Sequence, residues 1–394
     1  MRGWRRFTLG KTKPFAQHDS GALVAVICKF KRYLLPVMSK AWIPATLLAV
    51  ALTAAAVNGV SAAGEDVGAV IGITPLRLDQ SCPARYARSF RTPDGDIHLL
   101  GSFVITDQGR RVVVRPDSGP PWLSTDLTEA KINTFFSRPG LFLGLMSIVR
   151  PDTGGTFTGR MWRSFDGLKT LSQGKTVLLL PEAGRVDFGS SQIWAGLFFH
   201  RSVLELADGS LLAAMYGNFE TDSITPTNPR SKLETKFKLR AFTVRSTDNG
   251  GTWRYLSSVA VPRLAQPDDS EGYNEWTMAR LADGRLLGVI RTGHFTPLVA
   301  VWSADEGRSW STPRTPEGLG AAGVDPCLLR LHDGRLALAF GEMAQPPADV
   351  DREQYWREFA TRGDTRRRCR LALSLDQSGE SWRTRDVSCL GDRS

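Results

Sequence analysis

Short runs of alternating apolar and polar residues, separated by turn residues, recur along most of this chain. Asp-Gly pairs stand between such runs at Leu206–Leu212, Leu281–Leu287 and Leu331–Ala337, and a looser copy is Thr92–Ile97. Asp-Gly between alternating apolar runs is the strongest short signal for a β-hairpin. No long helical periodicity interrupts them, so the pattern predicts an all-β protein.

A second motif, S-x-D-x-G-x-x-W, alternates with the Asp-Gly turns. It is complete in Ser246–Trp253 and Ser303–Trp310, carries one inserted residue in Ser374–Trp382, and lacks the Trp in Ser164–Gly167. In such a turn the Asp accepts backbone hydrogen bonds, the Gly adopts a positive φ, and the Trp packs the turn onto a sheet. The motif therefore marks a second recurring turn in each repeat.

The two motifs together define a repeating unit of four strands. Each unit runs strand, Asp-Gly turn, strand, longer loop, strand, S-x-D-x-G-x-x-W turn and strand, over roughly 50–80 residues, which is typical of propeller repeats. We therefore predict a six-bladed β-propeller of four-stranded antiparallel blades over residues 64–394. The visible motifs account for nearer five blades, so the last blade is expected to be incomplete.

The positive charge of the chain is confined to its beginning. The formal net charge is +10, of which residues 1–40 contribute +8, whereas residues 41–63 carry no charge and residues 64–394 contribute +2. A basic start, an apolar stretch and the small residues Val60–Ala63 are typical of a secretory signal peptide over 38–63. We expect translation to start at Met38, with 1–37 an upstream extension, and the protein to be secreted or periplasmic. An uncleaved signal anchor, and with it membrane attachment, is the alternative. Because residues 64–394 are nearly neutral overall, we expect no basic face that would bind nucleic acid.

Cysteine and histidine usage predicts disulfides and no cofactor. Beyond Cys28 in the leader, the chain has Cys82, Cys327, Cys369 and Cys389. An even number of thiols in an oxidising compartment permits disulfides, and the last two flank a predicted hairpin. No CxxC or HExxH motif occurs and the histidines are scattered, so no metal site of His and Cys is expected.

The S-x-D-x-G-x-x-W repeats, known as Asp boxes, resemble those of the sialidase (BNR-repeat) superfamily. That resemblance implies an exo-acting glycoside hydrolase that removes a terminal acidic sugar, such as sialic acid, from a glycoconjugate. In this family three arginines hold the sugar carboxylate, which a guanidinium fork matches bidentately. A Glu paired with a Tyr nucleophile and an Asp acid/base complete the family site.

The clearest match to the family site is Glu275 with Arg291. They lie nine residues before and seven residues after Gly284 of an Asp-Gly turn, so adjacent antiparallel strands can bring both to one rim. The resemblance implies that Glu275 is catalytic and that Arg291 binds the substrate carboxylate. An ordinary surface Glu and Arg is the alternative interpretation.

The remaining family positions are assigned by their distance from the turns. Arg85 is the candidate first arginine, with Arg91 in reserve, and Arg366 is the third, with Arg370 as the alternative. Asp107 follows the second strand, where the family places its acid/base. Asp-x-Gly is also a plain turn, and a solvated basic edge is the other interpretation of the late arginines.

One position departs from the family pattern. The nucleophilic Tyr is expected about twenty residues after Ser374, and no Tyr follows Tyr355. Either the natural polypeptide continues beyond Ser394 or the protein lacks this nucleophile. The alternative function is a catalytically inactive Asp-box propeller that binds glycans or proteins, and a third is a hydrolase for a uronic or neutral sugar.

Overall fold

The structure is a computed structural model, and every regular element of its described residues except one turn of 3₁₀ helix is a β-strand. That turn is Thr153–Gly155. Nothing helical in this described part is long and apolar enough to cross a bilayer. The structure describes residues 24–26, 49–53, 72–76, 88–91, 97–100, 103–105, 112–114, 132–181, 197–227, 237–264, 270–293, 296–331, 333–343, 367–374 and 376–387.

Two small antiparallel sheets precede the main body. The first is β1 (Val24–Val26), β2 (Ala49–Thr53) and β3 (Gly72–Leu76). The second is β4 (Arg88–Arg91), β5 (Ile97–Leu100), β6 (Phe103–Ile105) and β7 (Val112–Val114). Only β2 of the leader predicted over residues 38–63 is described, so its role as a signal peptide stays a prediction.

The prediction of an all-β fold is confirmed, but the six-bladed propeller of antiparallel blades is wrong. Two antiparallel meanders are joined along both edges by the parallel pairs β8–β13 and β12–β16, so eight strands close into a mixed barrel. The first meander is β8 (Ile132–Arg138), β9 (Leu141–Met146), β11 (Phe157–Ser164) and β12 (Ser172–Leu179). The second is β13 (Leu197–Glu205), β14 (Leu211–Gly217), β15 (Arg240–Ser246) and β16 (Thr252–Ala260).

The physical reason for this correction is that turn motifs specify hairpins, not the pairing of distant edges. Each Asp-Gly or Asp-box turn fixes an antiparallel pair close in sequence. The parallel contact of β12 with β16 joins Val177 to Thr252, and no local signal encodes it. The strand β10 (Ile148–Pro151) pairs with both β11 and β13 beside the barrel.

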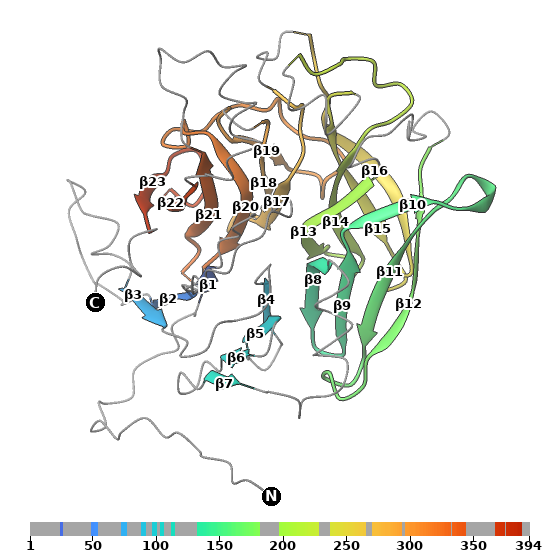
Figure 1. Cartoon of the computed structure of the whole chain (residues 1–394), viewed down its shortest axis with the longest axis horizontal. Helices are drawn as coiled ribbons and strands as arrows, with labels where there is room; N and C mark the ends of the chain where they lie inside the picture. Colours follow the sequence, from blue (N-terminus) through green and yellow to red (C-terminus); the bar gives the residue numbers. More distant parts are fainter. Residues whose placement is uncertain are drawn as a thin grey trace, which may run out of the picture.

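Two further antiparallel sheets follow the barrel in sequence and contact it. One is β17 (Trp276–Arg280), β18 (Leu286–Ile290) and β19 (Val299–Ser303). The other is β20 (Gly323–Arg330), β21 (Leu336–Met343), β22 (Arg367–Ser374) and β23 (Arg383–Asp386). Figure 1 shows both in orange to red, beside the green and yellow barrel, and β17 lies between β13 and β20.

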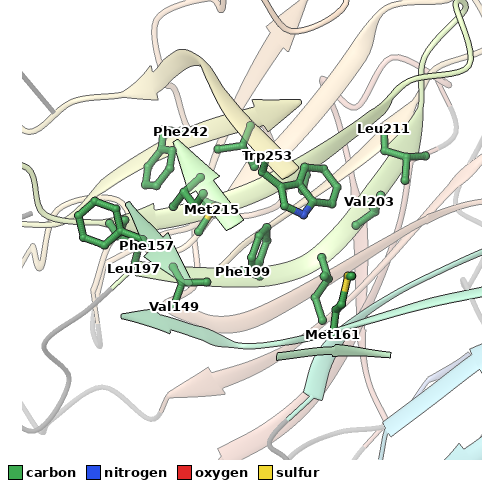
Figure 2. Packing of buried hydrophobic residues seen from close by; sticks show 14 of the residues in the cluster. Val149, Phe157, Met161, Leu197, Phe199, Val203, Leu211, Met215, Phe242 and Trp253 are labelled. Atoms are coloured by element: carbon green, nitrogen blue, oxygen red, sulfur yellow. The ribbon is translucent and has the colours of Figure 1, made fainter. Parts of the chain in front are cut away.

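The barrel is filled by a single cluster of buried apolar side chains. Figure 2 shows Phe199, Met215, Phe242 and Trp253 converging from β13, β14, β15 and β16. Phe199 and Trp253 meet edge to face with ring centroids 5.6 Å apart. Burial of such large rings supplies much of the driving force for closing the two meanders on each other.

The Asp boxes form the predicted turns, and the copies without an insertion share the same two bonds. In Ser246–Trp253 the Ser246 hydroxyl donates to Asp248 Oδ1 (2.8 Å), and Asp248 Oδ1 also accepts from the amide of Thr252 (2.8 Å). The degenerate copy at Ser164 makes the equivalent pair of bonds through Asp166, at 2.8 and 3.0 Å. The missing Trp therefore does not abolish the turn.

In the three Asp boxes that contain a Trp, the glycine also packs the turn against a leucine of an earlier strand. A Cβ added at Gly250 would lie 2.7 Å from Leu143 of β9, and one at Gly307 would lie 2.9 Å from Leu212 of β14. Gly379 has the same relation to Leu287 of β18, at 2.4 Å. In these three copies the box thus fixes both its own turn and a contact with an earlier strand.

We expect Asp248→Ala to lower the free energy of unfolding by about 1–3 kcal/mol, because two hydrogen bonds of a packed turn are lost. Urea unfolding measures the change. The matched control is Asp283→Ala, whose carboxylate lies in an exposed Asp-Gly turn and should cost under about 1 kcal/mol. Equal losses in the two variants would contradict the assigned role of the box.

The Asp-box carboxylates also predict how the protein responds to acid. Burial raises the pKa of Asp376, but hydrogen bonds from Ser374, Ser378 and Ser381 outweigh it and lower the pKa from 3.8 to about 2. A lowered pKa in the folded state stabilises the protein fully above the ordinary value, and this contribution is lost as the pH falls towards about 2. Asp376→Asn should therefore be less stable at neutral pH and should lose less stability between about pH 4 and pH 2. Thermal unfolding across that range tests this, and parallel curves for the two proteins would contradict it.

Candidate functional site

The strands β13, β17 and β20 end in the same Asp-Gly turn, and this gives them a common register. In each turn a leucine amide donates to the carbonyl four residues later, at 2.8, 2.8 and 2.7 Å. These leucines are Leu206, Leu281 and Leu331. Residues at the same distance before each leucine therefore occupy equivalent places in three neighbouring strands.

Side-chain hydroxyls four residues before these leucines tie the strands together. Ser202 Oγ accepts from the amide of Met278 at 2.8 Å, and Thr277 Oγ1 accepts from the amide of Leu328 at 3.2 Å. The two hydroxyls also lie 2.9 Å apart and share a hydrogen bond. The third residue of this row is Cys327, an exposed free thiol.

Six residues before the leucines, the same register brings together His200, Glu275 and Asp325. One nitrogen or oxygen of each lies within 4.8 Å of the others. The amide of Asp325 donates to Glu275 Oε2 at 3.0 Å. His200 Nδ1 lies 2.9 Å from the carbonyl of Trp276, which can only accept, so Nδ1 carries a hydrogen.

Two β-bulges aim charged side chains into this cluster. The pairing of β13 with β14 shifts between Phe199 and Val203, and that of β20 with β21 shifts between Val324 and Cys327. Within these bulges Arg201 and Asp325 adopt positive φ values of 58° and 57°. Left-handed backbone at a non-glycine residue costs on the order of 1–3 kcal/mol and is concentrated at functional sites.

The two strained residues form an ion pair with each other. Arg201 Nη2 lies 2.8 Å from Asp325 Oδ1, and His200 Nε2 lies 3.4 Å from the same oxygen. Burial alone would lower the pKa of Arg201, but the neighbouring carboxylates of Asp325 and Glu275 raise it above its ordinary value. The guanidinium is therefore permanently charged and favours the ionised form of Asp325.

Arg291 forms a second ion-paired centre beside the first. It follows β18, is buried, and places Nη2 3.0 Å from Glu271 Oε2 and Nη1 3.4 Å from Glu275 Oε2. The side-chain amide of Asn274 donates to Glu271 Oε2 at 2.8 Å. Arg291 thus favours the ionised form of both carboxylates.

Gly272 allows the segment that carries Glu271 and Glu275 to approach the barrel. Its φ is +94°, and a Cβ there would lie 2.3 Å from the carbonyl oxygen of Leu239. The backbone instead bonds directly, since the amide of Leu239 donates to the carbonyl of Glu271 at 2.8 Å and that of Tyr273 donates back to Leu239 at 2.6 Å. Any side chain at Gly272 would displace Glu271.

Of the sequence-predicted site residues, the structure brings Glu275 and Arg291 together. Arg370, the alternative third arginine, instead pairs with Glu342 of β21. Arg85, Asp107 and Arg366 lie outside the described residues, as do Cys82, Cys389 and the side chain of Arg91. Cys369 is disulfide-bonded.

Sequence reasoning missed His200, Arg201, Asp325 and Glu271. A usable signal was present, because His200, Glu275 and Asp325 each lie nine residues before the Gly of an Asp-Gly turn. A polar residue that recurs at one place in otherwise apolar strands indicates a shared position in space. Only the copy at Glu275 was interpreted in that way.

A comparison with family models assigns the chain to a family. The model of the BNR repeat-like domain matches residues 135–389, a span that contains four Asp boxes and the whole cluster. The chain belongs to the BNR repeat-like domain family. The resemblance to the BNR-repeat, sialidase-like superfamily is thereby confirmed.

Solved structures similar to this BNR repeat-like chain include three of different kinds. A protein of unknown function from Dyadobacter fermentans is 15% identical, with 87% of this chain and 72% of that chain covered and a TM-score of 0.41. The GH93 α-L-arabinofuranosidase of Fusarium graminearum, in complex with arabinobiose, is 17% identical, with 67% of this chain and 68% of that chain covered and a TM-score of 0.42. A Hadza microbial sialidase is 14% identical, with 87% of this chain and 56% of that chain covered and a TM-score of 0.41. No curated protein matches the chain.

We expect Thr277→Val to destabilise the protein by about 1–3 kcal/mol, because the buried amide of Leu328 would lose its acceptor. Urea unfolding measures the loss. Thr384→Val is the control, since the Thr384 hydroxyl bonds the Gly318 carbonyl in an exposed setting and should cost about 0.5 kcal/mol or less. If both variants lost the same stability, the hydroxyl row would have no special role in joining the strands.

Proposed function

We propose that this protein is an exo-acting glycoside hydrolase of the sialidase type, which removes a terminal acidic sugar such as sialic acid from a glycoconjugate. The observation that carries the proposal is the pairing of the buried Arg291 with the partly exposed Glu275. Arg291 Nη1 and Glu275 Oε2 lie 3.4 Å apart, beside the contacts of β17 with β13 and β20. Membership of the BNR repeat-like family supports it. An exported enzyme also agrees with the leader predicted over residues 38–63.

The chemistry follows from the charges of the two centres. Arg291 offers a guanidinium to a sugar carboxylate, in a cluster with a second guanidinium, Arg201. Glu275, held ionised by Arg291, can take a proton from an attacking hydroxyl. The three side chains thus provide a base and cationic donors at one place.

The same pairing means that a proton donor must come from elsewhere. Glu275 and Asp325 each contact a guanidinium, and a carboxylate stabilised in its ionised form is a poor acid. We assign that step to Asp107, and assign Arg85 and Arg366 as further partners of the sugar carboxylate. All three assignments come from the family resemblance.

We expect Glu275→Gln to lower kcat for a fluorogenic sialoside by about 10² to 10⁴-fold, because the base is removed while the shape is kept. Arg291→Ala should weaken kcat/KM for that sialoside by at least about tenfold more than for a neutral fluorogenic sugar. Release of the fluorophore by the full chain measures both effects.

Arg314→Ala is the matched control for the arginine variant, since Arg314 is exposed and pairs with Glu380 away from the cluster. It should leave the turnover of either substrate unchanged. Saturable sialoside binding by the wild-type protein without turnover would favour the glycan-binding alternative. Equal losses on the acidic and neutral sugars would rule out recognition of a carboxylate by Arg291.

A further inference from the structure

The cluster of His200, Glu275 and Asp325 has the composition of a metal-ion site. These residues come from three different sheets and are brought together only by the register of β13, β17 and β20. We propose that the three side chains bind one divalent cation. The inference uses the same part of the molecule as the proposed function but does not depend on glycosidase activity.

The spacing of the three ligand atoms suits a common ion. Ligands at about 2.1–2.3 Å from a metal, with angles of about 90–110°, lie about 3.0–3.8 Å from one another. His200 Nε2 and Asp325 Oδ1 are 3.4 Å apart, and all three ligand atoms fall within 4.8 Å of one another. Small rotations of the carboxylates would close the remaining gap.

The orientation of His200 gives a second reason. Its side chain is only 4% exposed, and its Nδ1 hydrogen is used by the carbonyl of Trp276. A metal-binding histidine usually donates one ring N–H to a backbone carbonyl or a carboxylate, which leaves its other nitrogen directed at the metal. His200 is oriented in this way, with Nε2 directed at Asp325 Oδ1. The orientation of His200 therefore suits a metal ion held between its Nε2 and the carboxylates of Glu275 and Asp325.

The charge balance of the cluster leaves room for an added cation. Glu271, Glu275 and Asp325 carry one more charge than the two guanidinium groups that contact them, Arg201 and Arg291. A carboxylate offers about four lone-pair sites, so Asp325 can contact Arg201 and a metal ion together. The guanidinium groups limit the affinity without blocking the ligand atoms.

The ligand set indicates which ion would bind. One imidazole nitrogen with two carboxylate oxygens suits Mn²⁺ or Zn²⁺, whereas Ca²⁺ takes oxygen ligands only. Three protein ligands leave further coordination positions for water or for oxygen atoms of a bound sugar. The proposed ion would thus sit beside Arg291, at the centre of the candidate site.

The test is isothermal titration of the full chain, freed of metal with EDTA, against Mn²⁺ and against Zn²⁺. We expect one equivalent of at least one ion to bind the wild-type protein. His200→Gln and Asp325→Asn should each weaken that binding by more than about tenfold. Asp283→Asn, which removes an exposed carboxylate elsewhere, should bind as the wild type does.

A second measurement keeps the test valid if a variant folds poorly. Binding to the native state raises the unfolding temperature, so the wild-type protein and the Asp283→Asn variant should both be stabilised by the ion. The proposal would be overturned if the wild-type protein bound neither Mn²⁺ nor Zn²⁺. It would also be overturned if the His200→Gln variant bound the ion with the affinity of the wild type. Sialoside hydrolysis is measured separately, so loss of one proposal leaves the other standing.

Discussion

The candidate site depends on one constraint, which is that β13, β17 and β20 share the same register relative to their turns. The hydroxyls of Ser202 and Thr277 impose this register, because each accepts a hydrogen bond from a backbone amide of the next strand. Successive side chains of a strand point to opposite faces, so a slip by one residue would turn its cluster residue away. The Asp-Gly turns fix the position of each residue along its own strand, and the hydroxyl groups align neighbouring strands with one another.

Local strain at the cluster is balanced by the charges that it brings together. Arg201 and Asp325 both hold left-handed backbone inside bulges, and their side chains meet at 2.8 Å. Neither conformation is favourable alone, so each depends on the packed sheets around it. The apolar side chains beneath, such as Phe199 next to His200 in β13, are fully buried and fix where the bulge can form. Rigid packing of the barrel is thus a condition for the ion pair.

Local sequence motifs predicted the hairpins, but they could not predict which distant strand edges pair. Asp-Gly and Asp-box turns predicted the hairpins correctly, even at Ser164, where the Trp is missing. The spacing around Gly284 also placed Glu275 beside Arg291. The barrel could not be predicted, because the parallel contact of Val177 with Thr252 has no turn of its own. His200 and Asp325 were missed since each looks like an isolated polar residue until the three strands are aligned.

Stability alone does not account for this concentration of charge. Replacing a buried ion pair by well-packed apolar residues is often neutral or stabilising, because desolvation offsets much of the Coulombic gain. Arg291 and Glu271 are nevertheless almost fully buried, at 7% and 3% exposure, and Arg291 also contacts Glu275, which remains partly open to solvent. A structural pair would gain nothing from an accessible third member. The arrangement instead keeps one carboxylate ionised, oriented and reachable, which is what binding or proton transfer at this place requires.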